Sequence, residues 1–393
     1  MFDFSHIPLA RLSLFHSKAR LFISVSGVAF AVLLMFVEMG FLNGLFDSQA
    51  HLATVFNADL IMMSNSKEAT IPLLPFPKSR LIQAKAFAGV TSAYPLYMEM
   101  ERARWKALPG KRPLATGPSE HKLVVFGFDP EDAVFQIPEV IRLAPLLKEP
   151  DTALFDIESK DVYGDVSPGS KAELSHRGVR VVGNFPFGAD FRVDGNVLVS
   201  DQTFSKLFPN PRTGEETSGN VEFGLLKLSP GTEPAAVQRA MMSSFNDVSI
   251  LTPQQFQTQI KKFWGEVQPV GIVFGMGMAF GFAIGVSICY QILYTDIFDH
   301  LAQYATLKAI GYSNGYVAGV VIVQAIYLTL LGFLPGALCS VGAYRLLHHL
   351  SGMIMQITPA RIVGIFALTL VMSVVAAIIA IRPALRFDPA EVF

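Results

Sequence analysis

The chain of 393 residues is 51% hydrophobic and only 16% charged, and its formal net charge is −1. Soluble domains carry about a quarter charged residues, so this composition and a mean hydropathy of +0.42 indicate an integral membrane protein in contact with membrane lipid. The balanced charge provides no basic field for nucleic acid. Both cysteines, Cys289 and Cys339, lie in apolar stretches, which excludes disulfide chemistry in the long polar part of the chain.

The first 45 residues predict an interfacial segment followed by a membrane-spanning helix. Residues 1–20 are basic and loosely amphipathic, which is typical of a segment at the membrane surface. Residues 21–45 are apolar apart from Glu38, which lies near the outer end. This apolar core is longer than that of a signal peptide, and no small-residue cleavage site follows it closely. We therefore interpret it as a retained first span.

Residues 46–268 form one long hydrophilic block that predicts a mixed α/β domain. Short β-rich runs end at glycine or proline turns, and a helix is expected to begin at Pro234. The expected strands are 123–126, 179–182, 196–200, 221–228 and 248–251. We predict a strand-rich lobe at about 115–215 and an α/β lobe built from 46–114 and 216–250.

Two further segments of this block suggest contacts beyond a domain core. Residues 71–77 are apolar and rich in proline, and they form either a partner contact or a loop packed on its own domain. Thr252-Pro253-Gln254-Gln255 is typical of a helix start, because Thr252 and Gln255 can cap each other's backbone amides. We expect a stalk helix over 252–268 that joins the domain to the next span.

Residues 269–294 contain no charge and are long enough to cross a bilayer. Gly277, Gly281 and Gly285 recur every fourth residue, so they share one helix face. Without Cβ atoms this face lets another helix approach closely, which favours helix association in lipid. We predict that these glycines form a helix-packing face.

Two more charge-free spans are expected at 317–344 and 362–381. The first of them contains Gly332, Pro335 and Gly336, where we expect a kink. The remaining segments are a polar stretch at 295–316, a short loop at 345–361 and a tail at 382–393.

Four spans place both termini on one side of the membrane. The bias of lysine and arginine in the short segments predicts which side that is. Those on the predicted inside are Arg11, Lys18, Arg20, Lys308, Arg382 and Arg386, against Arg345 and Arg361 on the other side. We therefore expect cytoplasmic termini and an external 46–268 domain.

The sequence contains no motif for catalysis or ATP binding. Gly110-Lys111 lacks the glycine spacing and the Ser or Thr of a phosphate-binding loop, and HExxH, GxSxG and CxxC are absent. His348-His349 are adjacent, so they face different sides of a helix and do not form a metal pair. Carboxylates such as Asp129 and Asp132 show no feature that distinguishes them from a solvated surface. We predict a chain that is not an enzyme and binds neither a metal nor a cofactor.

Ion-coupled transport is also disfavoured. Such transporters place ionisable groups inside their spans, whereas the expected cores of spans two to four carry no charge. Four helices leave little room for a substrate channel of the chain's own. Energy for any movement must then come from a partner, and an ATPase is the natural source.

Four segments resemble the DevC proteins, which are permeases of the wider FtsX/MacB superfamily. They are LARLSLFHSKARLFISVSGVAFAVLLMFVEMGFLNGLFDS (9–48), VVFGFDP (124–130), DHLAQYATLKAIGY (299–312) and DPAEVF (388–393). The likeness runs over essentially the whole chain. It implies a homodimeric permease of a type VII, MacB-like ABC system in the bacterial inner membrane, with a periplasmic domain between the first and second spans. The glycine face would then support the dimer.

The resemblance also implies partners. A separate DevA-like ATPase, which holds the ATP and magnesium, would dock from the cytoplasm. A DevB-like adaptor would link the periplasmic domains to a TolC-like outer-membrane duct. Such permeases transmit ATPase motion to a periplasmic chamber, and the DevC proteins serve glycolipid export. The alternative is an FtsX-like signalling scaffold, which would regulate an envelope enzyme and transport nothing.

Carried over by position, the resemblance assigns a cytoplasmic coupling segment. Its residues are Asp299, His300, Tyr304, Ala305, Thr306, Leu307, Lys308, Gly311 and Tyr312. The chain departs from the expected pattern at Gln303, where the family is expected to carry glutamate. For Lys308 the alternative is a lysine that extends to the membrane surface without contacting an ATPase.

Overall fold

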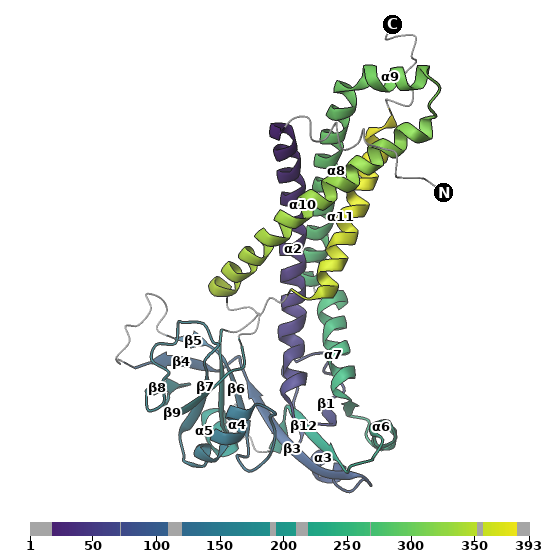
Figure 1. The fold of residues 1–393 in the computed structure, drawn as a ribbon. Helices are drawn as coiled ribbons and strands as arrows, with labels where there is room; N and C mark the ends of the chain where they lie inside the picture. The colour runs from purple at the N-terminus through teal and green to yellow at the C-terminus, as the bar shows by residue number, and fades with distance from the viewer. Residues whose placement is uncertain are drawn as a thin grey trace. The chain divides into compact units, whose positions relative to one another are not determined.

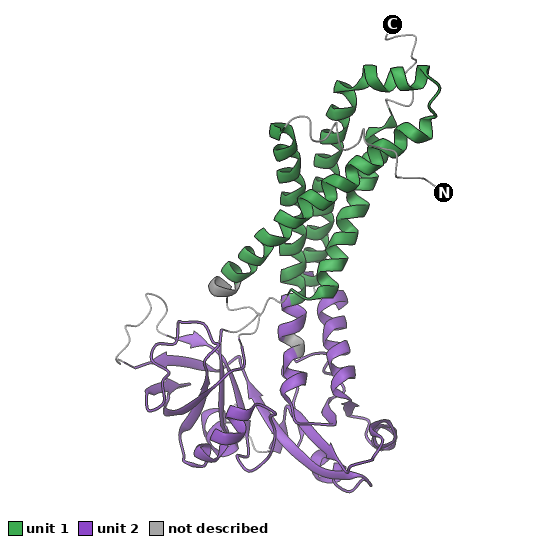
Figure 2. Ribbon diagram, in the orientation of Figure 1, with its two compact units in different colours: residues 1–43, 270–347, 355–393 green, residues 44–269, 348–354 purple. Residues whose placement is uncertain are grey.

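The computed structural model describes residues 18–70, 72–108, 120–188, 194–209, 219–267, 269–351 and 357–382, without the side chains of 49–50 and 348–351. Several sequence-based expectations fall outside these residues: the segment before Lys18, Gly110-Lys111, the side chains of His348-His349, and the tail beyond Arg382. The chain divides into two compact units (Figure 2), of which unit 1 comprises 1–43, 270–347 and 355–393, and unit 2 comprises 44–269 and 348–354.

Unit 1 is helical (Figure 1). Its elements are α2 (Lys18–Val55, which ends in unit 2), α8 (Pro269–Asp299), α9 (Leu301–Ala309), α10 (Asn314–Ser351) and α11 (Pro359–Ala380). Four of these helices are long and apolar enough to cross a membrane, which confirms the four expected spans at the level of length and composition. The spans are Lys18–Ser48, Pro269–Asp299, Asn314–Leu347 and Pro359–Ala380.

The helices of unit 1 share a buried core and carry apolar residues outside it. Val32 of α2, Leu293 of α8, Val321 of α10 and Ala376 of α11 belong to one buried cluster. Large apolar side chains also point outward, for example Phe280, which is 67% exposed. Apolar groups on both the inner and the outer faces are what a helix needs in a lipid environment.

Helix α10 is continuous and contains Pro335. The glycines that flank this proline pack closely against α2, because a Cβ at Gly332 would lie 2.6 Å from Val28 and one at Gly336 would lie 2.7 Å from the Ala29 carbonyl oxygen. Both positions therefore require the absence of a side chain so that α10 can approach α2.

Unit 2 is a mixed α/β domain, as expected. One sheet of eleven strands has the order β13-β1-β12-β3-β6-β10-β7-β9-β8-β4-β5. Its strands are β1 (Leu60–Ser64), β3 (Val90–Glu99), β4 (Arg104–Ala107), β5 (His121–Lys122), β6 (Val124–Phe128), β7 (Thr152–Asp156), β8 (Lys171–Leu174), β9 (Arg177–Phe185), β10 (Asn196–Ser200), β12 (Phe223–Leu228) and β13 (Val248–Leu251). A small second sheet pairs β2 (Phe76–Pro77) with β11 (Asn220–Val221).

Short helices complete unit 2. They are α3 (Ser79–Ala84), α4 (Pro138–Leu143), η2 (Ala144–Lys148), α5 (Asp201–Leu207), α6 (Pro234–Met242), α7 (Pro253–Lys262) and the π-helix η4 (Phe263–Val267). The predicted capping box of α7 is confirmed: Thr252 accepts a hydrogen bond from the Gln255 amide, and the Gln255 side chain accepts one from the Thr252 amide. The π-helix at the end of α7 was not expected from the sequence.

The long strand β3 joins two parts of the large sheet. Its residues from Val90 to Leu96 pair with β12, and those from Tyr97 to Glu99 pair with β6. Strands β1, β12 and β13 (60–64 and 223–251) lie on one side of this junction, and strands from 104–200 lie on the other. Strand β3 was not among the expected strands, and it contains Pro95, a residue that is uncommon in a central strand.

The apolar segment 71–77 is in part packed on its own domain. Phe76 is buried and pairs with Val221, and the Leu74 amide donates to the Glu222 carboxylate at 3.0 Å. These contacts favour the second of the two interpretations of this segment. Ile71 itself lies outside the described residues.

Each unit contains its own spectroscopic or chemical reporter. Both tryptophans of the chain, Trp105 and Trp264, are buried in unit 2. Both cysteines lie in unit 1, where Cys289 is buried and Cys339 is exposed. Tryptophan fluorescence therefore reports on unfolding of unit 2, and thiol labelling of Cys289 reports on unit 1.

Candidate functional site

The segment predicted to couple to an ATPase is a short helix between two long ones. Helix α8 ends at Asp299, and α9 begins after His300 (Figure 1). Helix α9 ends at Ala309, and Gly311 just beyond it has a φ of +106°, which suits only a residue without Cβ. The Gly311 amide donates to the Lys308 carbonyl and the Tyr312 amide donates to the Leu307 carbonyl. These two bonds form a Schellman motif, which stops α9 and lets α10 begin at Asn314.

The predicted coupling residues do not all lie on one surface. Thr306, Gly311, Tyr312 and Asp299 are exposed, whereas Tyr304 and Ala305 are buried in unit 1. His300, Leu307 and Lys308 are half-buried. Helix α9 therefore has an outward face that includes Gln303 and Thr306, and an inward face centred on Tyr304. The outward residues can meet a partner directly, and the half-buried ones, Lys308 among them, can do so with the exposed part of their side chains.

The inward face of α9 contacts a buried polar cluster that sequence reasoning missed. Asp296 of α8 is 7% exposed, and its Oδ2 accepts a hydrogen bond of 3.0 Å from Nε2 of the fully buried Gln324 of α10. His300 Nδ1 lies 3.4 Å from Asp296 Oδ1. The Tyr304 hydroxyl forms a hydrogen bond with Gln324, and burial, with the charge of Asp296, raises the pKa of Tyr304.

A signal for this cluster is present in the sequence. Asp296, His300 and Tyr304 are spaced by four residues, so on one continuous helix they would share a face. Gln324 carries a side-chain amide in a span that is charge-free and mostly apolar. The cluster was missed because residues 295–316 were assigned to a polar segment outside the span. In the structure α8 extends to Asp299, so Asp296 lies in the buried core.

An exposed ion pair lies near the same end of α8. Arg20 of α2 and Asp299 of α8 are 2.8 Å apart, with side chains 50% and 41% exposed. A pair with this much exposure contributes little to stability, because solvent screens its charges.

The predicted glycine face of α8 packs against other helices of the same chain. A Cβ at Gly277 would lie 2.5 Å from the Glu38 carboxylate of α2. At Gly285 a Cβ would overlap Met372 Sδ of α11 and lie 3.0 Å from Ala31 of α2. At Gly281 the nearest atom is Met35 Cγ at 3.6 Å, an ordinary contact. The face thus serves packing within unit 1, and its role in a dimer stays a prediction.

Replacing Gly285 by alanine is expected to destabilise unit 1 by about 1–3 kcal/mol, because the new methyl group overfills a packed site. Gly281→Ala is the matched control, since its Cβ meets no atom closer than 3.6 Å. Both variants would be made with Cys339→Ser, and dye labelling of Cys289 during heating would give the unfolding midpoints. Equal midpoints for the two variants would show that α8 does not pack this closely.

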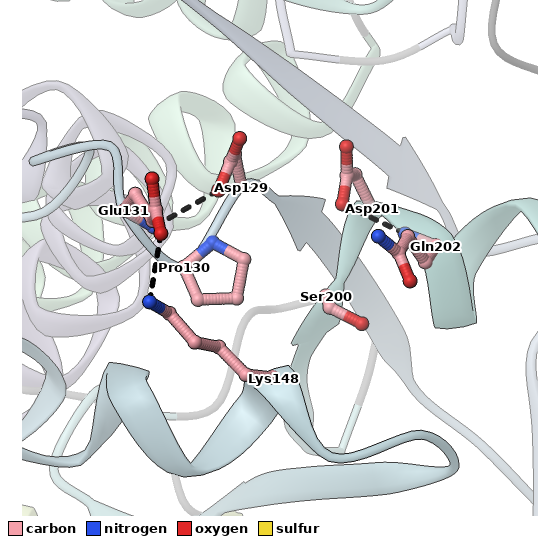
Figure 3. Close-up of a pocket in the computed structure, with 7 residues that line it drawn as sticks. All are labelled: Asp129, Pro130, Glu131, Lys148, Ser200, Asp201 and Gln202. Atoms are coloured by element: carbon pink, nitrogen blue, oxygen red, sulfur yellow. Dashed lines mark hydrogen bonds and ion pairs between the residues drawn. The ribbon is translucent and has the colours of Figure 1, made fainter.

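Unit 2 contains a polar pocket of about 320 Å³ (Figure 3). It is lined by Asp129, Pro130, Glu131, Lys148, Ser200, Asp201 and Gln202. Strands β6 and β10 are parallel, so their carboxyl ends meet at one edge of the sheet and bring Asp129 and Asp201 together there. Lys148 Nζ lies 2.7 Å from Glu131 Oε1. The structure thus places Asp129, which sequence reasoning treated as ordinary surface, in one pocket with Glu131 and Asp201.

Asp132 lies beside this group and has a perturbed pKa. Burial raises its pKa to about 6, and the negative charges of Asp129 and Asp201 act in the same direction. Lys85 and Lys78 partly oppose the shift. Within the described residues, no group of three or more His, Cys, Asp or Glu side chains is placed to hold a metal ion.

Asp132→Asn is expected to stabilise unit 2 above pH 7 and to have little effect near pH 4. A raised pKa means that the folded state binds the proton more tightly, so the wild type loses stability as the pH rises from about 4 through 6. Because Asp132 is only half-buried, the gain is discounted to about 1 kcal/mol. The tryptophan-detected melting temperatures of the wild type and the variant, measured from pH 4 to above pH 7, give this gain in stability. Glu101→Gln, at an exposed carboxylate, is the control. A wild-type-minus-variant difference that does not change with pH would contradict the assignment.

The similarity to a known protein family lies in the C-terminal helices. Residues 275–389, which include most of α8 together with α9, α10 and α11, match the family described as FtsX-like permease C-terminal. Comparison with curated proteins gives no match. Residues 275–389 are therefore similar to the C-terminal region of FtsX-like permeases.

Solved structures of external domains show weaker similarity. The periplasmic region of MacB from Actinobacillus actinomycetemcomitans is 9% identical with a TM-score of 0.35, and the alignment covers 53% of this chain and 94% of that one. The extracellular domain of the noncanonic ABC-type transporter YknZ from Gram-positive bacteria is 10% identical with a TM-score of 0.31, covering 50% of this chain and 99% of that one.

Proposed function

We propose that this chain is the permease subunit of an ABC-type exporter and that a separate ATP-binding subunit drives it. The observation that carries the proposal is the match of residues 275–389 to the FtsX-like permease C-terminal family. Helix α9 lies within this region and is a short helix with an outward polar face between two long apolar ones. A helix of this kind is suited to receive a partner outside the bilayer and to pass its displacement to the spans.

The finer assignment follows the DevC-like resemblance. The permease would work as a homodimer in the bacterial inner membrane, with its termini in the cytoplasm and unit 2 in the periplasm. A DevA-like ATPase would bind ATP and magnesium, and a DevB-like adaptor would connect unit 2 to a TolC-like duct. Motion of the ATPase would reach unit 2 by mechanotransmission, and the cargo would be a glycolipid or another amphiphile.

The size of unit 2 favours export over the alternative of an FtsX-like signalling scaffold. An external domain with an eleven-stranded sheet is larger than a scaffold needs for docking one envelope enzyme. Adaptor and ATPase genes next to this gene would support export. A neighbouring gene for a peptidoglycan hydrolase would support the scaffold.

The proposal is tested by purifying the full chain alone and together with the ATP-binding subunit encoded nearest to its gene. The chain alone is expected to hydrolyse no ATP above background, and the complex is expected to hydrolyse ATP and to remain together in detergent. ATP turnover by the chain alone, or failure of the two proteins to associate, would refute the proposed division of labour.

A further inference from the structure

The polar cluster around Asp296 links three helices at one end of unit 1. Asp296 belongs to α8 and Gln324 to α10, and the hydrogen bond between their side chains joins the two helices directly. The two residues are 7% and 0% exposed. A hydrogen bond that accepts on a carboxylate is stronger than one between neutral groups.

Helix α9 is attached to this pair at two points. His300, which connects α8 to α9, places Nδ1 2.8 Å from the Asp296 carbonyl oxygen and 3.4 Å from Asp296 Oδ1. One turn further on, Tyr304 is 7% exposed and its hydroxyl forms a hydrogen bond with the Gln324 side chain. Asp296 and Gln324 therefore lie at the centre of contacts that hold α9 against both α8 and α10.

The buried apolar side chains around the polar cluster favour a single arrangement of the three helices. Ile297, Val320 and Val321 are buried beside the polar groups, so no solvent is at hand to replace a broken hydrogen bond. A buried carboxylate that loses its partners is strongly disfavoured. The helices are therefore held in one arrangement, and a small sliding of α9 along α8 or α10 would break the network.

We propose that Asp296 and Gln324 are positioning residues that make the adjoining ends of α8, α9 and α10 move as one body. A partner that displaces the outward face of α9 would then move both attached spans without contacting them. The role of the partner rests on the proposed function, whereas the attachment of α9 is a property of the chain alone. Neither residue needs to contact the partner.

The attachment is tested on the full chain in detergent by amide hydrogen exchange of peptides that cover Leu301–Ala309. Asp296→Leu is expected to accelerate exchange in α9 roughly tenfold or more, which corresponds to losing a buried charge-assisted hydrogen bond. Asp296→Asn keeps an oxygen that can accept from Gln324 and should stay close to wild type. Asp299→Asn is the matched control, because it breaks only the exposed pair with Arg20 on the same helix end.

Exchange in α9 that is the same in Asp296→Leu, Asp299→Asn and wild type would overturn the proposal. Protection of Cys289 from thiol labelling checks that unit 1 remains folded. If Asp296→Leu does not fold, Gln324→Leu takes its place in the exchange measurement. This variant removes the hydrogen-bond partner that Asp296 and Tyr304 share. Gln324→Leu with wild-type exchange in α9 would equally overturn the proposal.

A second measurement separates this inference from the proposed function. Spin labels at the exposed residues Ala302 of α9 and Leu330 of α10, in a chain without its native cysteines, report the distance between the two helices. In the presence of the ATP-binding subunit and ATP, the distribution of label-to-label distances should be narrow in the wild type. It should be broader in Asp296→Leu, although the subunit still binds. Equal distance distributions in the wild type and in Asp296→Leu would contradict the inference. A wild type that binds no such subunit would instead reject the proposed function, and the exchange result would stand.

Discussion

Lys67→Met is expected to destabilise unit 2 by about 3–5 kcal/mol, because it leaves a buried carboxylate without its opposing charge. Lys67 is 1% exposed and forms an ion pair with Glu222, which is 3% exposed. Its Nζ also lies 4.4 Å from the centroid of the Phe223 ring. Burial lowers the pKa of Lys67 and raises the pKa of Glu222, and the charge of each partner opposes the shift of the other.

The pair fixes contacts between segments that are far apart in sequence. Glu222 also accepts the Leu74 amide, and the Gln259 side chain of α7 donates to the Lys67 and Glu68 carbonyl oxygens. Phe223 contacts Phe256 of α7 edge to face, with ring centroids 5.8 Å apart. Loss of the charge at Lys67 should therefore loosen α7 as well as the sheet.

A double variant provides the control for Lys67. In Lys67→Met with Glu222→Gln, the amide oxygen of the glutamine can still accept from Leu74 while no charge remains buried. We expect this variant to recover most of the lost stability. Tryptophan-detected melting of the full chain measures the wild type and both variants, because both tryptophans lie in unit 2. A double variant as unstable as Lys67→Met would show that the buried charge is not the cause.

Lys308→Glu is expected to reduce association with the ATP-binding subunit at least tenfold in a pull-down, roughly the effect of truncating a strong interface residue. Lys308 lies in the last turn of α9 and is half-buried. Reversal of its charge should act against both an acidic surface of the partner and the negative C-terminal end of α9.

Two further variants distinguish this role from that of a lysine that only extends to the membrane surface. Lys308→Arg keeps the charge and should retain association. Lys261→Glu makes the same reversal at an exposed lysine of α7, in the domain expected outside the cytoplasm, and should leave association unchanged. Normal recovery of the subunit with Lys308→Glu would show that the assignment of the coupling segment is wrong.

Features that depend on neighbouring residues could be predicted from the sequence. The four spans follow from the length of apolar runs, and the α7 start follows from Thr252 and Gln255, which are three residues apart. The strands β10 and β13 were predicted with their observed bounds because each is short and bounded by turn residues. In each case the determining residues lie within the element itself or directly beside it in the sequence.

Other strands could not be read from local pattern. Strands β7 and β10 are both fully buried, but β10 contains two valines, whereas Thr152 is the one β-branched residue of β7. Strand β3 contains a proline. Their identity as strands depends on partners elsewhere in the sheet, such as the parallel pairing of β7 with β9 and the pairing of β3 with both β12 and β6.

By itself, the sequence determined that this is a four-span membrane protein with a mixed α/β domain, and where its candidate coupling segment lies. Only the tertiary structure decided which polar groups are buried together. Asp296 and Gln324 are 28 residues apart, and Lys67 and Glu222 are 155 apart. No local pattern specifies which distant helix or strand will supply a partner for a buried charge, since that choice is made by the packing of the whole unit. The glycine face of α8 shows the same limit: its spacing predicted close packing, and the fold decided that α2 and α11 of the same chain occupy it.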